Sequence, residues 1–107
     1  MTDKIIVFVT CESMEQAEKI AEAVVTEKLA ACVNVLPGIR SCYVWERKMT
    51  WAEELLLVIK TTRGRFGQLQ DRVKGLQSYE VPEVVSISID EASQPYLDWI
   101  DTSVGGR

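Results

Sequence analysis

The stretch Ala31–Thr62, ACVNVLPGIRSCYVWERKMTWAEELLLVIKTT, decides the fold, because it holds two long β-forming segments joined by a short polar turn. Residues 31–46 are rich in Val, Tyr and Trp, and Pro37-Gly38 predicts one kink or bulge within that strand. We predict the turn at Arg47-Lys48-Met49 and the returning strand at Thr50–Thr62. Together the two strands form a long β-hairpin.

The length of this hairpin has a structural consequence. A strand covering residues 31–46 would extend about 53 Å at roughly 3.3 Å per residue. A compact chain of 107 residues has a diameter of only about 34 Å. The hairpin must therefore bend or protrude. Its distal part carries apolar and aromatic residues, and on a protruding hairpin with exposed edges these favour pairing with another chain: Ile39, Tyr43, Val44, Trp45 and Trp51. We expect a homo-oligomer in which this arm adds to a neighbour's sheet. The alternative is a hairpin that curls over its own helix-free sheet face.

The segments outside the hairpin alternate between strand and helix patterns. Lys4–Cys11 is a buried-type strand, and Ser13 followed by Gln16 caps an amphipathic helix whose apolar positions run to Leu29. Three further elements complete the chain: a helix on Phe66, Leu69, Val73 and Leu76, a strand over Val81–Asp90, and a short helix capped by Ser93 that holds Tyr96, Leu97, Trp99 and Ile100. The polar tail Ser103–Arg107 is expected to fray.

This order of elements predicts an α+β fold. Two βαβ halves joined by the hairpin give the ferredoxin-like (split βαβ) sandwich, here with a long hairpin and an extra C-terminal helix. We expect a single domain over residues 1–107. In that arrangement the helices cover one face of the sheet, and something else must cover the other.

The composition excludes several functional classes. The chain has no histidine, which removes the usual proton shuttle and the commonest metal ligand and excludes Ser-His-Asp catalysis, Cys-His catalysis and histidine-containing zinc sites. A net charge of −4 does not suit a nucleic-acid partner. No apolar run is long enough to cross a membrane. Cys11, Cys32 and Cys42 form no CxxC pair, which favours reduced thiols and a cytoplasmic location. Cys32 lies in an apolar context and is expected in the core.

The segment Tyr79-Glu80-Val81-Pro82-Glu83 is the candidate binding loop. It places a phenol and two carboxylates between the second helix and the fourth strand. Together with Cys11 at the end of the first strand, these groups could hold a soft or borderline divalent ion. The alternative is a buried tyrosine hydrogen-bonded to the backbone, with the glutamates on the rim. Glu53 and Glu54 alternate along their strand and should face opposite sides.

A set of motifs extends over nearly the whole chain: Lys28–Asn34, Leu36-Pro37-Gly38, Ser41, Tyr43-Val44-Trp45-Glu46 with Lys48, Glu54, Leu56, Lys60-Thr61, Tyr79–Glu83 and Tyr96–Ile100. In these motifs, their order and their spacing the chain resembles the CutA divalent-cation tolerance family. The resemblance implies a ferredoxin-like subunit, a cytoplasmic homotrimer built by the hairpins, no established catalysis, and a link to copper and other divalent cations.

Three departures from the family pattern bear on metal binding and on the hairpin. The family histidine before the fourth strand is Gln77 here, and an amide is a poor metal ligand beside imidazole. Some members carry a metal-linked cysteine within the first strand, at a position that, counted back from Cys32, is closer to Val9 than to Cys11. The usual turn glycine is Arg47 here. The resemblance therefore implies either weakened copper binding or a metal site that uses Cys11 and Glu80 at a subunit boundary.

A second functional class stays open at this point. The PII signalling proteins are similar in fold and trimeric assembly, and they regulate by binding small molecules. For that class, a pocket between subunits would be lined by Trp45, Lys60, Tyr79 and Glu83.

Overall fold

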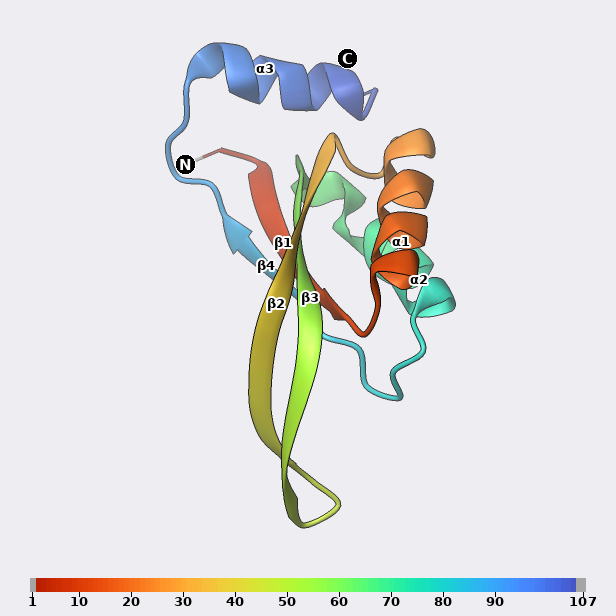
Figure 1. Cartoon of the computed structure of the whole chain (residues 1–107). Helices are drawn as coiled ribbons and strands as arrows, with labels where there is room; N and C mark the ends of the chain where they lie inside the picture. Colours follow the sequence, from red (N-terminus) through yellow and green to blue (C-terminus); the bar gives the residue numbers. More distant parts are fainter. Residues whose placement is uncertain (1, 106–107) are drawn as a thin grey trace.

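The computed structural model describes residues 2–105 and contains one four-stranded antiparallel sheet with helices beside it (Figure 1). The elements in chain order are β1 (Lys4–Cys11), α1 (Met14–Thr26), β2 (Cys32–Trp45), β3 (Lys48–Thr62), a 3₁₀ turn (Arg63–Arg65), α2 (Phe66–Leu76), β4 (Val84–Ser88) and α3 (Gln94–Ser103). The sheet order is β2-β3-β1-β4. This order interleaves the two βαβ halves and confirms the predicted ferredoxin-like fold.

Helices α1 and α2 pack on one face of the sheet (Figure 1). The Ser13 side chain accepts a 3.1 Å hydrogen bond from the backbone N–H of Gln16, which confirms the predicted start of α1. The core between these layers joins alternate residues of β1 and β3 to one stripe of each helix: Ile5, Val7, Val9, Cys11, Ala17, Ile20, Val24, Leu57, Ile59, Leu69 and Val73. In this layer the apolar residues that recur about every 3.6 positions in the helices pack against those that recur every second position in the strands.

The hairpin β2–β3 protrudes from the sheet, as its length predicts, and does not curl over its own sheet face (Figure 1). The described chain measures 47 × 25 × 22 Å along its principal axes. The register of β2 on β3 shifts between Leu36 and Ile39, which confirms the bulge at Pro37-Gly38. Gly38 has φ +82°, a left-handed conformation that glycine adopts without a steric cost.

The hairpin turn lies earlier than predicted. Glu46 and Arg47 form it, with φ of +53° and +70°, and Lys48 already pairs with Trp45. A two-residue turn with both residues left-handed matches the right-handed twist of the two strands, which explains why the strands pair up to this point. The strand register therefore determines the position of the turn, although Glu46 and Arg47 have little intrinsic preference for left-handed conformations.

Four other sequence predictions need correction. β4 is shorter than Val81–Asp90, because its pairing with β1 ends at Val84 opposite Val9. α1 ends at Thr26, and a left-handed Lys28 (φ +61°) turns the chain so that Leu29 reaches the core from outside the helix. Cys32 is only half-buried and belongs to the helix-free side of the sheet. Val104, expected in a frayed tail, is 1% exposed and packs against Ile100; residues 106–107 lie outside the described residues.

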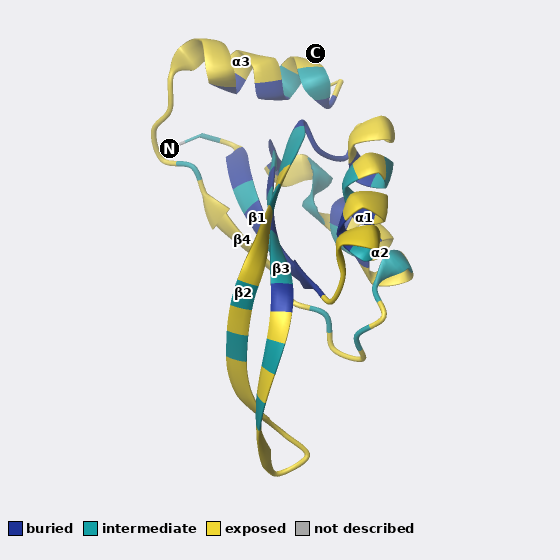
Figure 2. Ribbon diagram, in the orientation of Figure 1, coloured by how far each residue is buried: buried dark blue, intermediate teal, exposed yellow. Residues whose placement is uncertain are grey.

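The helix-free face of the sheet leaves a row of apolar side chains in solvent. Most of β4 is coloured as exposed in Figure 2. Leu36, Val85 and Ile87 are 42–49% exposed, and Phe8 and Val58 lie half-buried between them. The longest described helix, α1, has 13 residues, and no helix within residues 2–105 has the length and apolarity to cross a membrane. The exposed apolar row therefore belongs to the strands of the sheet and not to a helix.

Candidate functional site

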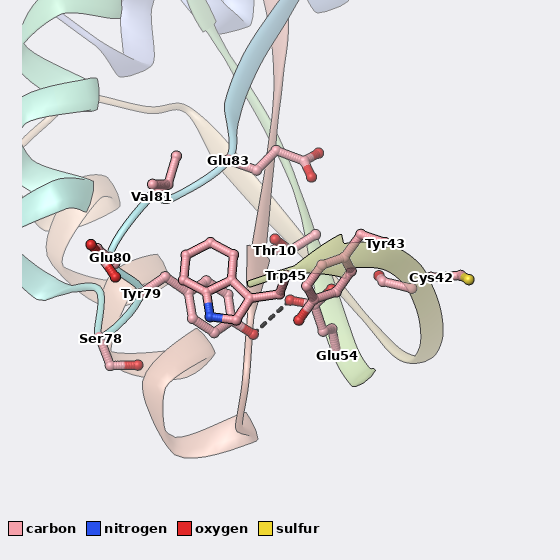
Figure 3. Close-up of a pocket in the computed structure, with 11 residues that line it drawn as sticks. Thr10, Cys42, Tyr43, Trp45, Glu54, Ser78, Tyr79, Glu80, Val81 and Glu83 are labelled. Atoms are coloured by element: carbon pink, nitrogen blue, oxygen red, sulfur yellow. Dashed lines mark hydrogen bonds between the residues drawn. The ribbon is translucent and has the colours of Figure 1, made fainter. Parts of the chain in front are cut away.

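A cavity of about 640 Å³ lies where the hairpin leaves the sheet (Figure 3). Three segments enclose it: the end of β1, both strands of the hairpin, and the loop between α2 and β4. Its lining residues are Thr10, Ser41, Cys42, Tyr43, Trp45, Glu54, Ser78, Tyr79, Glu80, Val81 and Glu83. The cavity exists because the loop 78–83 passes beside the bulged hairpin, so residues far apart in sequence share one space.

The Tyr79 hydroxyl donates a 2.6 Å hydrogen bond to Glu54 Oε2 across this cavity. Burial and this bond to a carboxylate raise the pKa of the Tyr79 phenol well above its usual range. Glu54 is 8% exposed, whereas Glu53 is exposed, which confirms that the two carboxylates face opposite sides of the strand. The Tyr79–Glu54 hydrogen bond links the predicted binding loop to the hairpin. The hydrogen-bond partner of the tyrosine is thus a carboxylate and not the backbone.

The cavity is acidic. Glu54, Glu80 and Glu83 line it, and none of its described lining residues is a lysine or arginine. Carboxylate oxygens attract cations, and the partly enclosed position of Glu54 weakens the screening of its charge by water. The site is therefore chemically suited to a positively charged ligand.

The structure does not bring Cys11 and Glu80 together in this cavity. Glu80 lines the cavity, but Cys11 is fully buried on the helix side of β1. Burial, and secondarily the charge of Glu54, raise the pKa of the Cys11 thiol to about 11, so the thiolate that binds metals is disfavoured. Among residues 2–105 no group of three or more Cys, Asp or Glu side chains is placed to hold a metal ion.

Gln77 covers this thiol. Its Nε2 donates a 2.6 Å hydrogen bond to the Thr10 carbonyl oxygen and lies 3.9 Å from Cys11 Sγ. Its Oε1 is buried and finds no hydrogen-bond partner among the described residues. The amide of Gln77, the first residue after α2, thus lies against the end of β1 beside the Cys11 thiol.

The four residues predicted to line a shared pocket separate into two groups. Trp45, Tyr79 and Glu83 all line the cavity. Lys60 does not, because it lies six residues beyond Glu54 on the same strand face, which is about 20 Å away at roughly 3.3 Å per residue. Its ammonium group instead donates a hydrogen bond to Asn34 Oδ1.

Sequence reasoning did not select Glu54 or Thr10 as site residues. Thr10 gives no chemical signal on its own. Glu54 does carry one: it is the last acidic residue before the apolar run Leu55–Ile59, on the face opposite Glu53. A carboxylate at the edge of a buried strand needs a partner, and that requirement points to a hydroxyl such as that of Tyr79.

Comparison with known proteins gives a consistent result. The model of the family "CutA1 divalent ion tolerance protein" matches residues 5–103. The "Divalent-cation tolerance protein CutA" of Thermus thermophilus is 46% identical over 94% of this chain and 97% of its own length. "Protein CutA, chloroplastic" of Arabidopsis thaliana is 43% identical over 92% of this chain, which spans about half (54%) of that longer relative. The crystal structure of CutA from Xylella fastidiosa superposes with a TM-score of 0.94 at 35% identity, over 96% of this chain and 99% of the other.

Proposed function

The chain belongs to the CutA1 divalent ion tolerance protein family, and from this premise we propose that it contributes to tolerance of divalent cations as a cytoplasmic homotrimer without catalytic activity. The cavity beside the Glu54–Tyr79 pair is its ligand site. The comparisons do not favour the alternative of a PII-like regulator, because the family match covers residues 5–103 and the relatives of known name are CutA proteins.

One observation carries the choice of ligand site: three glutamates line the cavity and no described basic side chain does. Such a site favours a cation over a nucleotide or another anionic metabolite, since an anion would meet like charges at close range.

The residues present do not fit a preformed high-affinity copper or zinc site. Borderline divalent ions prefer imidazole and thiolate ligands. Here the Cys11 thiol is buried, its raised pKa favours the protonated form, and Gln77 Nε2 lies 3.9 Å from its sulfur. The sulfur of Cys42, which lines the cavity, points away from it. We therefore propose weak binding through carboxylates, with the described donors of a single chain leaving most coordination positions to water or to a neighbouring copy.

The exposed sheet face supports the trimer. Leu36, Val85 and Ile87 present a contiguous apolar row, and the hairpin extends beyond the sheet beside it. A second copy that covered this row would remove the exposed apolar surface from water. The three free cysteines support a reducing compartment, although the Arabidopsis relative is named chloroplastic.

Calorimetric titration of the reduced protein with Zn²⁺ tests the ligand site. We expect weak binding that is reduced further in Glu54→Gln. Glu53→Gln is the matched control, because it removes the same charge from the same strand but on the outer side. Equal binding by the wild type and Glu54→Gln, or an equal loss in both variants, would contradict the cavity as the site.

A further inference from the structure

Two sulfur atoms lie close together on the far side of the hairpin. Cys42 Sγ is 3.3 Å from Met49 Sδ, and both residues are exposed. Cys42 is on β2 opposite Trp51, and Met49 is on β3 opposite Val44, so the two are diagonal neighbours across the strand pair. Although the Cys42 backbone borders the cavity, its sulfur points away from it (Figure 3).

This pair has the chemistry of a soft-metal site. A thiolate and a thioether are the protein ligands that select univalent copper, whereas carboxylates suit harder ions. The position of the pair, on the opposite face of the hairpin from Glu54 and Tyr79, separates it from the acidic cavity.

The distance allows both sulfurs to bind one ion. Metal–sulfur bonds of about 2.3 Å, as for zinc, would place a shared ion at an S–metal–S angle of roughly 90° when the sulfurs are 3.3 Å apart. Widening their separation by about 1.3 Å would make the arrangement linear with the same bond lengths. Met49 is 69% exposed and has three rotatable side-chain bonds, so rotation can supply that movement.

We propose that Cys42 and Met49 form a two-sulfur binding site for univalent copper on the outer face of the hairpin. Binding forms two copper–sulfur bonds and releases the thiol proton to solvent, while copper keeps its +1 charge. The bound pair is then neutral, because the thiolate charge cancels that of the ion. This site is independent of the divalent-cation site proposed above.

The site is tested with the full reduced chain under anaerobic conditions. Cu(I) is titrated in competition with the chromophoric chelator bathocuproine disulfonate, and we expect one protein-bound Cu(I) per chain. Cys42→Ser should abolish this binding. Met49→Leu, which preserves volume but removes the thioether, should weaken it by about tenfold or more, as loss of a ligand typically costs at least what loss of a supporting contact does.

Cys32→Ser is the matched control. Cys32 is a partly exposed thiol on the same strand, but its Sγ lies 3.9 Å from Asn34 Oδ1 and not beside a thioether. This variant should bind Cu(I) like the wild type. Wild-type affinity in Met49→Leu, equal loss in Cys32→Ser, or no Cu(I) bound by the wild type would each overturn the proposal.

A second titration separates the two sites. Zn²⁺ binding should be unchanged in Met49→Leu, because Met49 does not line the cavity, and Cu(I) binding should be unchanged in Glu54→Gln. Loss of Cu(I) in Glu54→Gln would place the ion in the cavity and refute the two-sulfur site, whatever the result for Zn²⁺.

Discussion

The Tyr79 hydroxyl donates to the Glu54 carboxylate, and this 2.6 Å bond ties the loop between α2 and β4 to the base of the hairpin. The carboxylate is nearly buried, so few water molecules can replace the tyrosine as its partner. The bond thus contributes both to the shape of the cavity and to stability.

Replacing this tyrosine should destabilise the protein measurably. Tyr79→Phe leaves Glu54 without its hydroxyl donor, and we expect a loss of about 2 kcal/mol in the free energy of unfolding. Guanidinium unfolding at fixed chain concentration measures it. Tyr43→Phe is the control, because Tyr43 lines the same cavity but is exposed; its change should stay within about 0.5 kcal/mol. Equal effects would show that the bond does not stabilise the fold.

The buried thiol predicts a loss of stability at alkaline pH. The pKa of Cys11 rises from 9.0 to about 11 in the folded chain, so folding favours the protonated thiol. Its contribution is fully present below pH 9 and is lost as the pH rises to about 11, a total of roughly 2–3 kcal/mol. Cys11→Ala should therefore lose less stability than the wild type between pH 8 and 11. If the free energy of unfolding had the same pH dependence in both proteins, the alkaline loss would not come from Cys11. Tyr79 is present in both proteins, so its contribution cancels in the comparison.

The open sheet face should control assembly. Val85→Glu places a charge in the exposed apolar row, so we expect it to dissociate the proposed trimer, as measured by light scattering at micromolar concentration. Val25→Glu makes the same change at a comparably exposed position on α1, 41% against 49%, and should leave the trimer intact. A trimer in Val85→Glu, or dissociation in Val25→Glu, would show that this face is not the interface.

An imidazole beside Cys11 should strengthen metal binding. Gln77→His replaces an amide by a good ligand between the thiol and the cavity loop, and we expect tighter Zn²⁺ binding by about tenfold, lost below roughly pH 6.5 as the imidazole protonates. Gln68→His, on the exposed side of α2, adds the same group away from the cavity and should not change binding. Calorimetry that finds no difference between the variants would remove Gln77 as the cause of weak binding.

The hairpin turn contains a residue whose replacement should stabilise the fold. Arg47 has φ +70°, which costs a residue with a Cβ about 1 kcal/mol, and glycine adopts that conformation freely. Arg47→Gly should raise the free energy of unfolding by about 0.5–1 kcal/mol. Lys48→Gly, one residue into β3, should lower it instead. Destabilisation by Arg47→Gly would contradict this account of the turn.

Local signals in the sequence predict most of the fold. The Ser13 cap, the apolar period of α2 and the break at Pro37-Gly38 each arise from contacts within a few residues, and each is confirmed. The turn position is wrong because strand register, which depends on every cross-strand pair, moves it to Glu46 and Arg47.

The cavity was harder to predict for the same physical reason. Tyr79 and Glu83 were identified from their loop, but Glu54 lies 25 residues from Tyr79 and only the folded sheet brings them together. Lys60 does not line this cavity within one chain, and sequence alone does not tell how far along a strand a pocket extends. Its place in a pocket between subunits stays a prediction. The single domain over residues 1–107 and the absence of catalysis stay predictions.

The place of β1 in the sheet has a consequence for how the protein is made. Of the four strands, β1 is synthesised first and lies between two others, and its partners are Leu55–Thr62 and Val84–Ser88. At about 5–20 residues per second, synthesis reaches the end of β4 roughly 4–15 s after it passes Cys11. Until residue 62 has been made, the apolar segment Ile5–Val9 has neither neighbouring strand, and until residue 88 has been made it has only one. The nascent chain must therefore keep its most buried strand from pairing elsewhere during that interval.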